Sequence, residues 1–205
     1  MAALSYQHLF QPGTDPAAPP LLLLHGTGGT ERDLLPLART LSPGSAVLSP
    51  RGNVSEGGAA RFFARLAEGV FDPAEITRRT HELADFIAAA SKPYAFDPAR
   101  LIAVGFSNGS NVAATLLLLR PESLGGGVLL RAMVVLDQST AAGSLTGKRV
   151  LLVNGASDPI VPPDQQPHLA ALLRAGGADV TAKLLPAGHG LTQADLAAAQ
   201  AWFKK

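Results

Sequence analysis

The sequence predicts an α/β fold in which a mostly parallel central sheet is covered by helices on both faces. Three observations support this prediction. Short apolar segments typical of strands alternate with helical patterns along the chain. The segment LLLL at residues 21–24 is apolar throughout, as expected for a strand buried on both faces of a parallel sheet. No repeat or linker interrupts the alternation, so residues 1–205 are expected to form a single domain.

Strands are expected where β-prone residues run together between glycine, proline or polar residues. The first is expected to be an edge strand, followed by the loop QPGTDPAAPP. The expected strands cover residues 6–10, 21–24, 46–48, 101–106, 128–130, 150–154 and 180–185. Between the third and the fourth, residues 50–72 are rich in glycine and arginine and are expected to be irregular.

Helices are expected in the intervals between these strands. The clearest start is at Asp72, which is placed as an N-cap before Pro73, with Glu75 at the capping-box position. Apolar residues at helical spacing follow from Ile76. The expected helices cover residues 33–41, 72–90, 108–119, 164–175 and 192–203.

Composition excludes several classes of function. The 205 residues carry a formal net charge of +1, and the basic residues are scattered, so neither nucleic acid nor a stable membrane association is expected. The absence of cysteine rules out disulfides, thiolate metal sites and a cysteine nucleophile, and no metal site is expected. The sequence shows no signal-peptide pattern and no apolar run near the ~20 residues of a membrane span. A soluble cytoplasmic protein is expected.

The segment GFSNG at residues 105–109 places a serine where an expected strand meets an expected helix. A Gly-x-Ser-x-Gly string alone is a weak signal. At a strand-to-helix corner, however, it is typical of a nucleophile elbow, in which the serine backbone is strained and the flanking chains approach closely. Gly105 and Gly109 meet the need for small residues there. The sequence therefore indicates that Ser107 is a nucleophile.

A nucleophilic serine needs a base and an acid that orients the base. His189 lies between two glycines on the loop after the last expected strand, and we expect it to be the base. Asp158 follows the strand at 150–154 and is the favoured acid. Asp137 also follows a strand and is the rival, but it lies after an earlier strand and does not lead into Pro-Ile-Val-Pro. The order serine, aspartate, histidine is the chain order of α/β-hydrolases.

The loop HGTGG at residues 25–29 follows the apolar strand at 21–24. In this architecture an amide of that loop and the amide after the nucleophile stabilise the oxyanion, which nominates the amides of Thr27 and Asn108. A phosphate-binding loop is the alternative, but no Gly-Lys-Ser/Thr ending is present. We expect His25 to fix the loop through hydrogen bonds.

With these motifs in place, the sequence resembles small bacterial carboxylesterases of the phospholipase/carboxylesterase branch of the α/β-hydrolases, which are related to acyl-protein thioesterases. The resemblance rests on LLLLHGTGGTERDLLPLA, LSPRG, RFFARLAEGVFD, GFSNGSNVAATLLLLRPE, LLRAM, NGASDPIVP and GHGLT. It implies an α/β-hydrolase fold without a large lid domain, ester or thioester hydrolysis through an acyl-enzyme, and no cofactor. Similar proteins are often homodimers, but the sequence itself does not indicate an oligomeric state. Asn108 stands where thioesterase and lysophospholipase lines usually carry glutamine, which weakens any inference of a long-chain lipid substrate.

Substrate contacts are expected from loops at the carboxyl ends of the strands. The sequence nominates four residues for an apolar, partly cationic pocket: Arg51, Phe62, Phe63 and Arg131. The alternative is that these arginines are solvated and the phenylalanines fill a small satellite core. Arg61 and Arg65, which stand beside the phenylalanines, are expected to be solvated. The expected function is hydrolysis of small, short-chain esters. A long-chain thioesterase or lysophospholipase is the alternative, and a catalytically silent ligand-binding protein is disfavoured because serine, aspartate and histidine are all present.

Overall fold

The computed structural model describes residues 4–204 and contains a seven-stranded sheet with the order β1-β3-β2-β6-β7-β8-β9. Its strands are β1 (His8–Gln11), β2 (Leu21–Leu24), β3 (Val47–Pro50), β6 (Ile102–Phe106), β7 (Gly126–Leu130), β8 (Arg149–Gly155) and β9 (Asp179–Leu185). Every neighbouring pair is parallel except β1 and β3, and β1 is an edge strand. The prediction of a mostly parallel sheet is confirmed.

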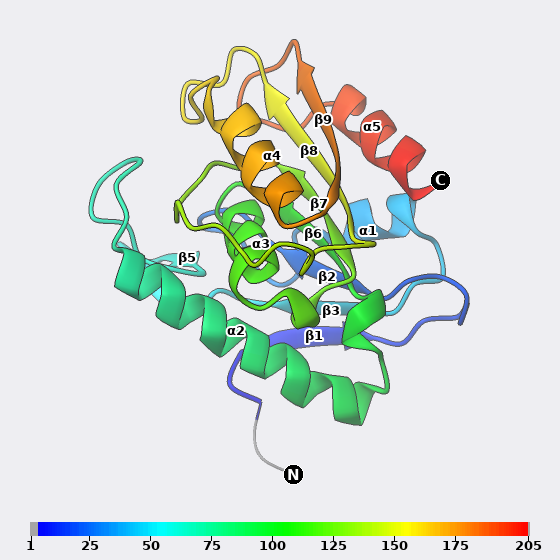
Figure 1. Cartoon of the computed structure of the whole chain (residues 1–205). Helices are drawn as coiled ribbons and strands as arrows, with labels where there is room; N and C mark the ends of the chain where they lie inside the picture. The colour runs from blue at the N-terminus through cyan, green and yellow to red at the C-terminus, as the bar shows by residue number, and fades with distance from the viewer. Residues whose placement is uncertain (1–3, 205) are drawn as a thin grey trace.

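Five α-helices cover the two faces of this sheet, as Figure 1 shows. The helices are α1 (Leu35–Leu41), α2 (Pro73–Tyr94), α3 (Asn108–Leu119), α4 (Gln165–Ala175) and α5 (Gln193–Phe203), and short 3₁₀ turns lie at Pro98–Arg100 and Pro121–Ser123. Helices α2, α3 and α4 pack on one face, while α1 and α5 pack on the other. The side chains of β2 alternate between these two cores, which explains why all four of its leucines are buried.

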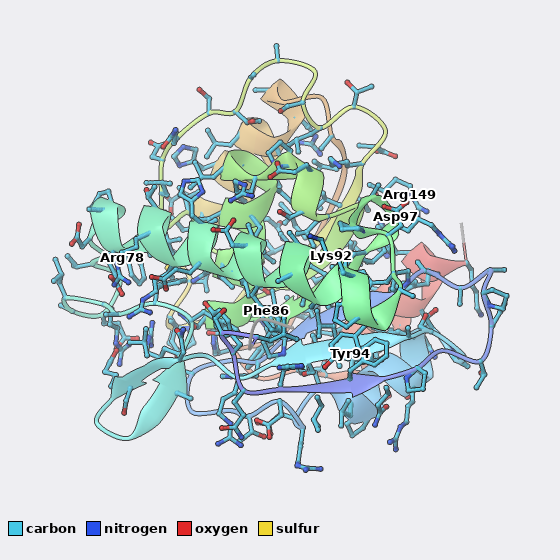
Figure 2. All side chains as sticks on the ribbon, turned by 90° about the horizontal axis from the view of Figure 1, so that it is seen from below. Arg78, Phe86, Lys92, Tyr94, Asp97 and Arg149 are labelled. Carbon is cyan, nitrogen blue, oxygen red and sulfur yellow. The ribbon has the colours of Figure 1, made fainter. Side chains whose placement is uncertain are left out.

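Helix α2 packs along β1 and extends four residues beyond its expected end. Tyr94 stacks on Phe10 with ring centroids 4.0 Å apart, and its hydroxyl hydrogen-bonds to His8 Nε2 at 2.7 Å. Figure 2 shows Phe86 and Tyr94 at two points along this helix, between it and the sheet. These contacts hold the last turn although it contains Pro93. At the other end Asp72 caps the helix, but the expected capping box is absent because Glu75 pairs with arginines of the next turn.

A two-stranded hairpin, β4 (Val54–Glu56) and β5 (Ala59–Arg61), occupies the segment that was expected to be irregular. Gly57 and Gly58 form its turn with φ of 57° and 88°, and positive φ at both central residues is the geometry that hairpin turns favour. The Gly-Gly pair between two short runs was the signal for this hairpin. The loop that joins β5 to α2 projects from the body of the molecule (Figure 1).

The strand order places a crevice at the carboxyl ends of β2 and β6. From β2 the chain passes to β3 on one side, and it then returns to build β6 to β9 on the other. Ligands of open α/β sheets bind outside the strand ends at such a switch point. The loop after β2 and the turn after β6 therefore meet where a site is expected. Among residues 4–204, no helix has the length and apolar character needed to cross a bilayer.

Candidate active site

Ser107 lies on a strained turn between β6 and α3. Its φ of 52° and ψ of −117° are unusual for a residue with a side chain, and such strain is concentrated at functional sites. A Cβ at Gly105 would come within 2.7 Å of the Ser110 amide nitrogen, and one at Gly109 within 1.9 Å of the Leu24 carbonyl oxygen. Only glycine fits at either position, as the sequence pattern predicts for a nucleophile elbow.

Ser107, His189 and Asp158 form one hydrogen-bonded chain. His189 Nε2 lies 3.0 Å from Ser107 Oγ, and His189 Nδ1 lies 2.8 Å from Asp158 Oδ2. The Asp158 side chain is fully buried and also accepts hydrogen bonds from the amides of Ile160 and Val161. Burial alone would raise the pKa of Asp158, but the hydrogen bonds from Ile160, His189 and Val161 outweigh it and hold this pKa below its usual value. The aspartate therefore stays ionised and orients the imidazole.

The rival acid, Asp137, lies apart from this chain. Its side chain is 68% exposed, and its Oδ1 lies 3.1 Å from His168 Nε2. His189 uses Asp158 instead, because the loops that carry these two residues are bonded to each other: the Ser157 amide donates to the Ala187 carbonyl at 3.0 Å.

The amides of Thr27 and Asn108 lie at the crevice and are available to a ligand. Asn108 is the first residue of α3, so its N–H has no acceptor within the helix, and the Thr27 amide donates to no residue in the described part of the chain. The β4–β5 hairpin holds both residues. Arg61 Nη1 donates to Thr27 Oγ1 at 2.8 Å, and the Phe62 amide donates to Asn108 Oδ1 at 2.8 Å.

His25 fixes the loop after β2. Its Nδ1 is 2.7 Å from the Gly26 carbonyl, and its Nε2 accepts a hydrogen bond from the Gly52 amide at 2.9 Å. Burial lowers the pKa of His25, which favours the neutral imidazole that this pair of contacts requires. His25 therefore fixes this loop through hydrogen bonds, which is the structural role that the sequence indicated.

A pocket of about 380 Å³ opens beside Ser107. The residues that line it are Thr27, Arg61, Arg65, Glu68, Gly69, Phe71, Phe106, Ser107, Asn108, Asn111, Arg131, Met133, Ile160, Val161 and His189. A larger groove of about 600 Å³ lies over α1 and α5, but it includes neither Ser107 nor His189. Within residues 4–204 no group of three or more histidine, aspartate or glutamate side chains could hold a metal ion.

The structure places three of the four nominated substrate contacts elsewhere. Phe62 and Phe63 are fully buried in the core beneath α2 and α3, and Phe71, not nominated from the sequence, lines the pocket in their stead. Arg51 lies outside the pocket lining and forms a two-point ion pair with Glu31, with distances of 2.5 and 3.0 Å. The position of the phenylalanines follows from the hairpin, since Phe62 and Phe63 come directly after β5 and are buried.

Arg131 reaches the pocket, but its guanidinium is committed to the protein. Its side chain is fully buried and forms two hydrogen bonds to Asp195, at 2.6 and 2.9 Å. It also donates to the carbonyls of Gly188, Gly190 and Val153. These bonds use all five N–H donors of the group. Since two of the acceptors flank His189, Arg131 holds the histidine loop and has no donor left for a substrate.

Arg61 is the pocket residue that sequence reasoning missed. It was expected to be solvated, whereas its side chain is 4% exposed at the end of β5 and lines the pocket together with Arg65. The Gly57-Gly58 turn was the signal that could have found it, because a hairpin centred there pairs Arg61 with Val54 and carries the arginine back toward the sheet.

Comparison with known proteins agrees with this geometry. Residues 63–205 match the sequence model of the family described as phospholipase/carboxylesterase. The chain is 40% identical to MhqD of Bacillus subtilis (strain 168) over 199 residues, which cover 97% of this chain and 98% of that protein.

Solved structures agree as well. The crystal structure of the Bacillus cereus carboxylesterase has a TM-score of 0.94 and 44% identity, covering 98% of this chain and 94% of that one. The structure of YahD with malic acid has a TM-score of 0.91 and 30% identity, covering 97% of this chain and 98% of that one. The protein is thus a hydrolase that belongs to the phospholipase/carboxylesterase family of α/β-hydrolases.

Proposed function

We propose that the protein hydrolyses short carboxylic esters through an acyl-enzyme formed on Ser107. The observation that carries this proposal is the continuous hydrogen-bonded chain from Ser107 Oγ through His189 to the buried Asp158. The same three groups in the same order of contacts perform acyl transfer on several unrelated folds.

Each group has one role in this reaction. Ser107 Oγ attacks the ester carbonyl carbon while its proton passes to His189 Nε2, and Asp158 stabilises the imidazolium. The amides of Thr27 and Asn108 donate to the oxyanion, a contribution of about 3–4 kcal/mol for a donor of this kind. His189 then protonates the leaving alkoxide as the C–O bond breaks. A water molecule, deprotonated by the same imidazole, attacks the carbonyl carbon of the acyl-enzyme. The bond between this carbon and Ser107 Oγ then breaks, the imidazolium returns the proton to Oγ, and the acid is released.

The size and charge of the pocket support a short substrate. A volume of about 380 Å³ is at the small end of ligand pockets, and charged side chains interrupt its apolar surface. Each additional methylene of an acyl chain contributes about 0.8 kcal/mol only where it is buried. The structure of the neighbour YahD was solved with malic acid, a small hydroxy acid, which is consistent with a pocket of this size.

One observation favours the alternative, a long-chain thioesterase or lysophospholipase. Leu66 and Val70 are 73% and 50% exposed on the loop that lines one edge of the pocket, and Ile160, at its lining, is 39% exposed. A chain longer than the pocket would cross these side chains. A profile of kcat/KM from acetate to palmitate esters decides between the two functions. We expect a maximum at short acyl chains, and a steady rise to palmitate would select the alternative.

Labelling with a fluorophosphonate tests the nucleophile directly. The wild-type protein should react at one serine, and Ser107→Ala should neither react nor hydrolyse esters. Ser110→Ala is a matched control, because Ser110 lies one turn into α3 and its Oγ donates to the Leu130 carbonyl, away from His189. Labelling of the Ser107→Ala protein would transfer the nucleophile to another residue and overturn this assignment. The absence of any labelling in the wild type would overturn the proposal and favour a silent binding protein.

A further inference from the structure

The guanidinium of Arg61 is buried in the pocket wall but only partly used by the protein. Its Nε donates to the Phe63 carbonyl at 3.1 Å, and its Nη1 donates to Thr27 Oγ1 at 2.8 Å. A guanidinium has five N–H donors, and Nη2 donates to no residue within the described chain. Since Arg61 lines the pocket, these spare donors are available to whatever the pocket binds.

The charge of Arg61 is also incompletely balanced. Glu56 lies between two arginines, with its Oε2 3.3 Å from Arg61 Nε and its Oε1 2.7 Å from Arg65 Nε. Glu68 is the next carboxylate, and it pairs with Arg65 at 3.9 Å. Burial lowers the pKa of Arg61, the charges of Glu56 and Glu68 only partly offset this effect, and the nearby charge of Arg65 adds to it. A ligand anion in direct contact with the spare N–H donors of Arg61 would favour its charged form.

The side-chain amide of Asn108 is a further unused donor in the same wall. Its side chain is buried, its Oδ1 accepts from the Phe62 amide, and its Nδ2 has no hydrogen-bond acceptor among residues 4–204. Buried polar groups normally have partners, so an orphan amide in a pocket wall points to a ligand acceptor. The carboxylate that lines this part of the pocket belongs to Glu68, which is 66% exposed and 3.9 Å from Arg65. An exposed ion pair of that length is weak and easily displaced.

We propose that Arg61, with Arg65 and Asn108, binds a carboxylate of the substrate, so that the preferred substrates are short esters bearing a free carboxylate, such as half-esters of small dicarboxylic acids. A carboxylate matches the planar fork of a guanidinium and accepts two parallel hydrogen bonds from it. Phe71, Met133 and Val161, which line the rest of the pocket, suit the short apolar spacer. This inference rests on the proposed function, because Ser107 must attack the esterified end.

The test compares two esters of matched shape. Ethyl hydrogen succinate carries a carboxylate where ethyl levulinate carries a neutral methyl ketone. The measured quantity is the ratio of their kcat/KM values, taken from ethanol release near neutral pH. A hydrogen bond to a charged partner corresponds to about a tenfold to hundredfold preference, so the wild-type ratio should favour the succinate ester by at least about tenfold.

Variants assign the preference to residues. Arg61→Met should bring the ratio to about one or below, whatever happens to the absolute rates, which Arg61 also affects through Thr27. Arg65→Met should lower the ratio less, because Arg65 is 31% exposed. Arg51→Met is the matched control, since it removes an arginine that does not line the pocket, and it should leave the ratio unchanged.

Calorimetric titration with succinate provides a readout that does not depend on turnover. Succinate should bind to the wild-type protein and to Ser107→Ala, and binding should be lost in Arg61→Met. A wild-type ratio near one, an equal loss of both esters in Arg61→Met with the ratio retained, or undiminished succinate binding by that variant would each overturn the proposal. If Arg61→Met does not fold, the wild-type ratio and Arg65→Met decide. Succinate binding without hydrolysis of any ester would instead contradict the proposed function alone.

Discussion

Two buried arginines of the pocket lining, Arg61 and Arg131, differ in how much of the guanidinium the protein uses. Arg131 directs every donor to the protein, and its acceptors include the carbonyls on either side of His189. Arg61 is almost equally buried, but it donates to two acceptors, the Phe63 carbonyl and Thr27 Oγ1. Its other N–H groups have no acceptor in the described part of the chain. The comparison teaches that burial of a cation does not by itself indicate ligand binding. The number of its donors left unsatisfied is the better guide.

The two arginines also stabilise different parts of the site. Arg131 joins the loop after β7 to the histidine loop and to the start of α5, where Asp195 also accepts from Thr192 in a capping box. Arg61 joins the hairpin to the loop after β2. The loop of His189 is thus held by an arginine whose donors are all used, and Thr27 is held by an arginine that has donors left for a ligand.

The largest effect on activity is expected at Asp158, which orients His189. Asp158→Asn should lower kcat on the order of 10⁴-fold with little change in stability, because the imidazole would be held in the wrong tautomer. Asp137→Asn is the matched control, since its side chain is exposed and bonded to His168, and kcat should change by less than about twofold. The measurement is steady-state hydrolysis of a short ester. Reversal of the two results would transfer the role to Asp137.

The next largest effect is expected at Arg131. Arg131→Met would leave Asp195 charged, buried and without its cation, so the free energy of unfolding in urea should fall by about 3–5 kcal/mol. Arg131→Met combined with Asp195→Leu removes both charges and should recover part of this loss. Activity should stay low, because the carbonyls of Gly188 and Gly190 would still lack their donor. Recovery of full activity in the double variant would show that Arg131 does not position His189.

A smaller effect on the free energy of unfolding is expected when the pH is lowered, through the two buried carboxylates Asp195 and Asp158. Burial alone would raise the pKa of Asp195, but hydrogen bonds from Arg131 and Thr192 hold it below the usual value, and the pKa of Asp158 is lowered in a similar way. A carboxyl whose pKa is lower in the folded state stabilises the protein above the unfolded value of about 3.9, and this contribution is lost as the pH falls through the folded value.

The free energy of unfolding should therefore vary little with these two groups from pH 7 to about 5 and fall steeply below about pH 4. Urea unfolding at a series of pH values measures this dependence. Asp158→Asn removes one of the two groups, so its decline should be shallower than that of the wild type. An equally steep decline in the variant would mean that Asp158 does not contribute.

The smallest effect is expected at Arg51, outside the pocket. Arg51→Met should lower the melting temperature only slightly, because Glu31 loses its partner but Arg51 is partly exposed to solvent and the pair is screened by water. Thermal unfolding measures the loss. Competitive inhibition by small carboxylates should be unaltered, and its disappearance would return Arg51 to the substrate contacts that the sequence nominated.

The sequence was sufficient to bring together the side chains that lie at the carboxyl ends of strands. Ser107, Asp158 and His189 each follow a strand recognisable from local pattern, and parallel strands bring their carboxyl ends to one edge. Arg131 also follows a strand, yet its use could not be predicted, because its partner Asp195 lies 64 positions away on another element. Phe62 and Phe63 were assigned to the pocket since the hairpin before them was not recognised. The direction of the phenylalanine side chains depended on that turn. The Gly57-Gly58 pair indicated the turn, but no periodic pattern in residues 50–72 indicated the direction.

The contact of Gly109 with the Leu24 carbonyl has a consequence for engineering and for evolution. This close approach packs the turn that carries Ser107 against β2. The position of Ser107 therefore depends on the register between β2 and β6. The loop at residues 64–71 lies outside the sheet but supplies Arg65, Glu68, Gly69 and Phe71 to the pocket. A library that varies this loop would therefore explore new substrate preferences at nearly constant chemistry, whereas one that varies residues 105–109 would yield mostly inactive chains.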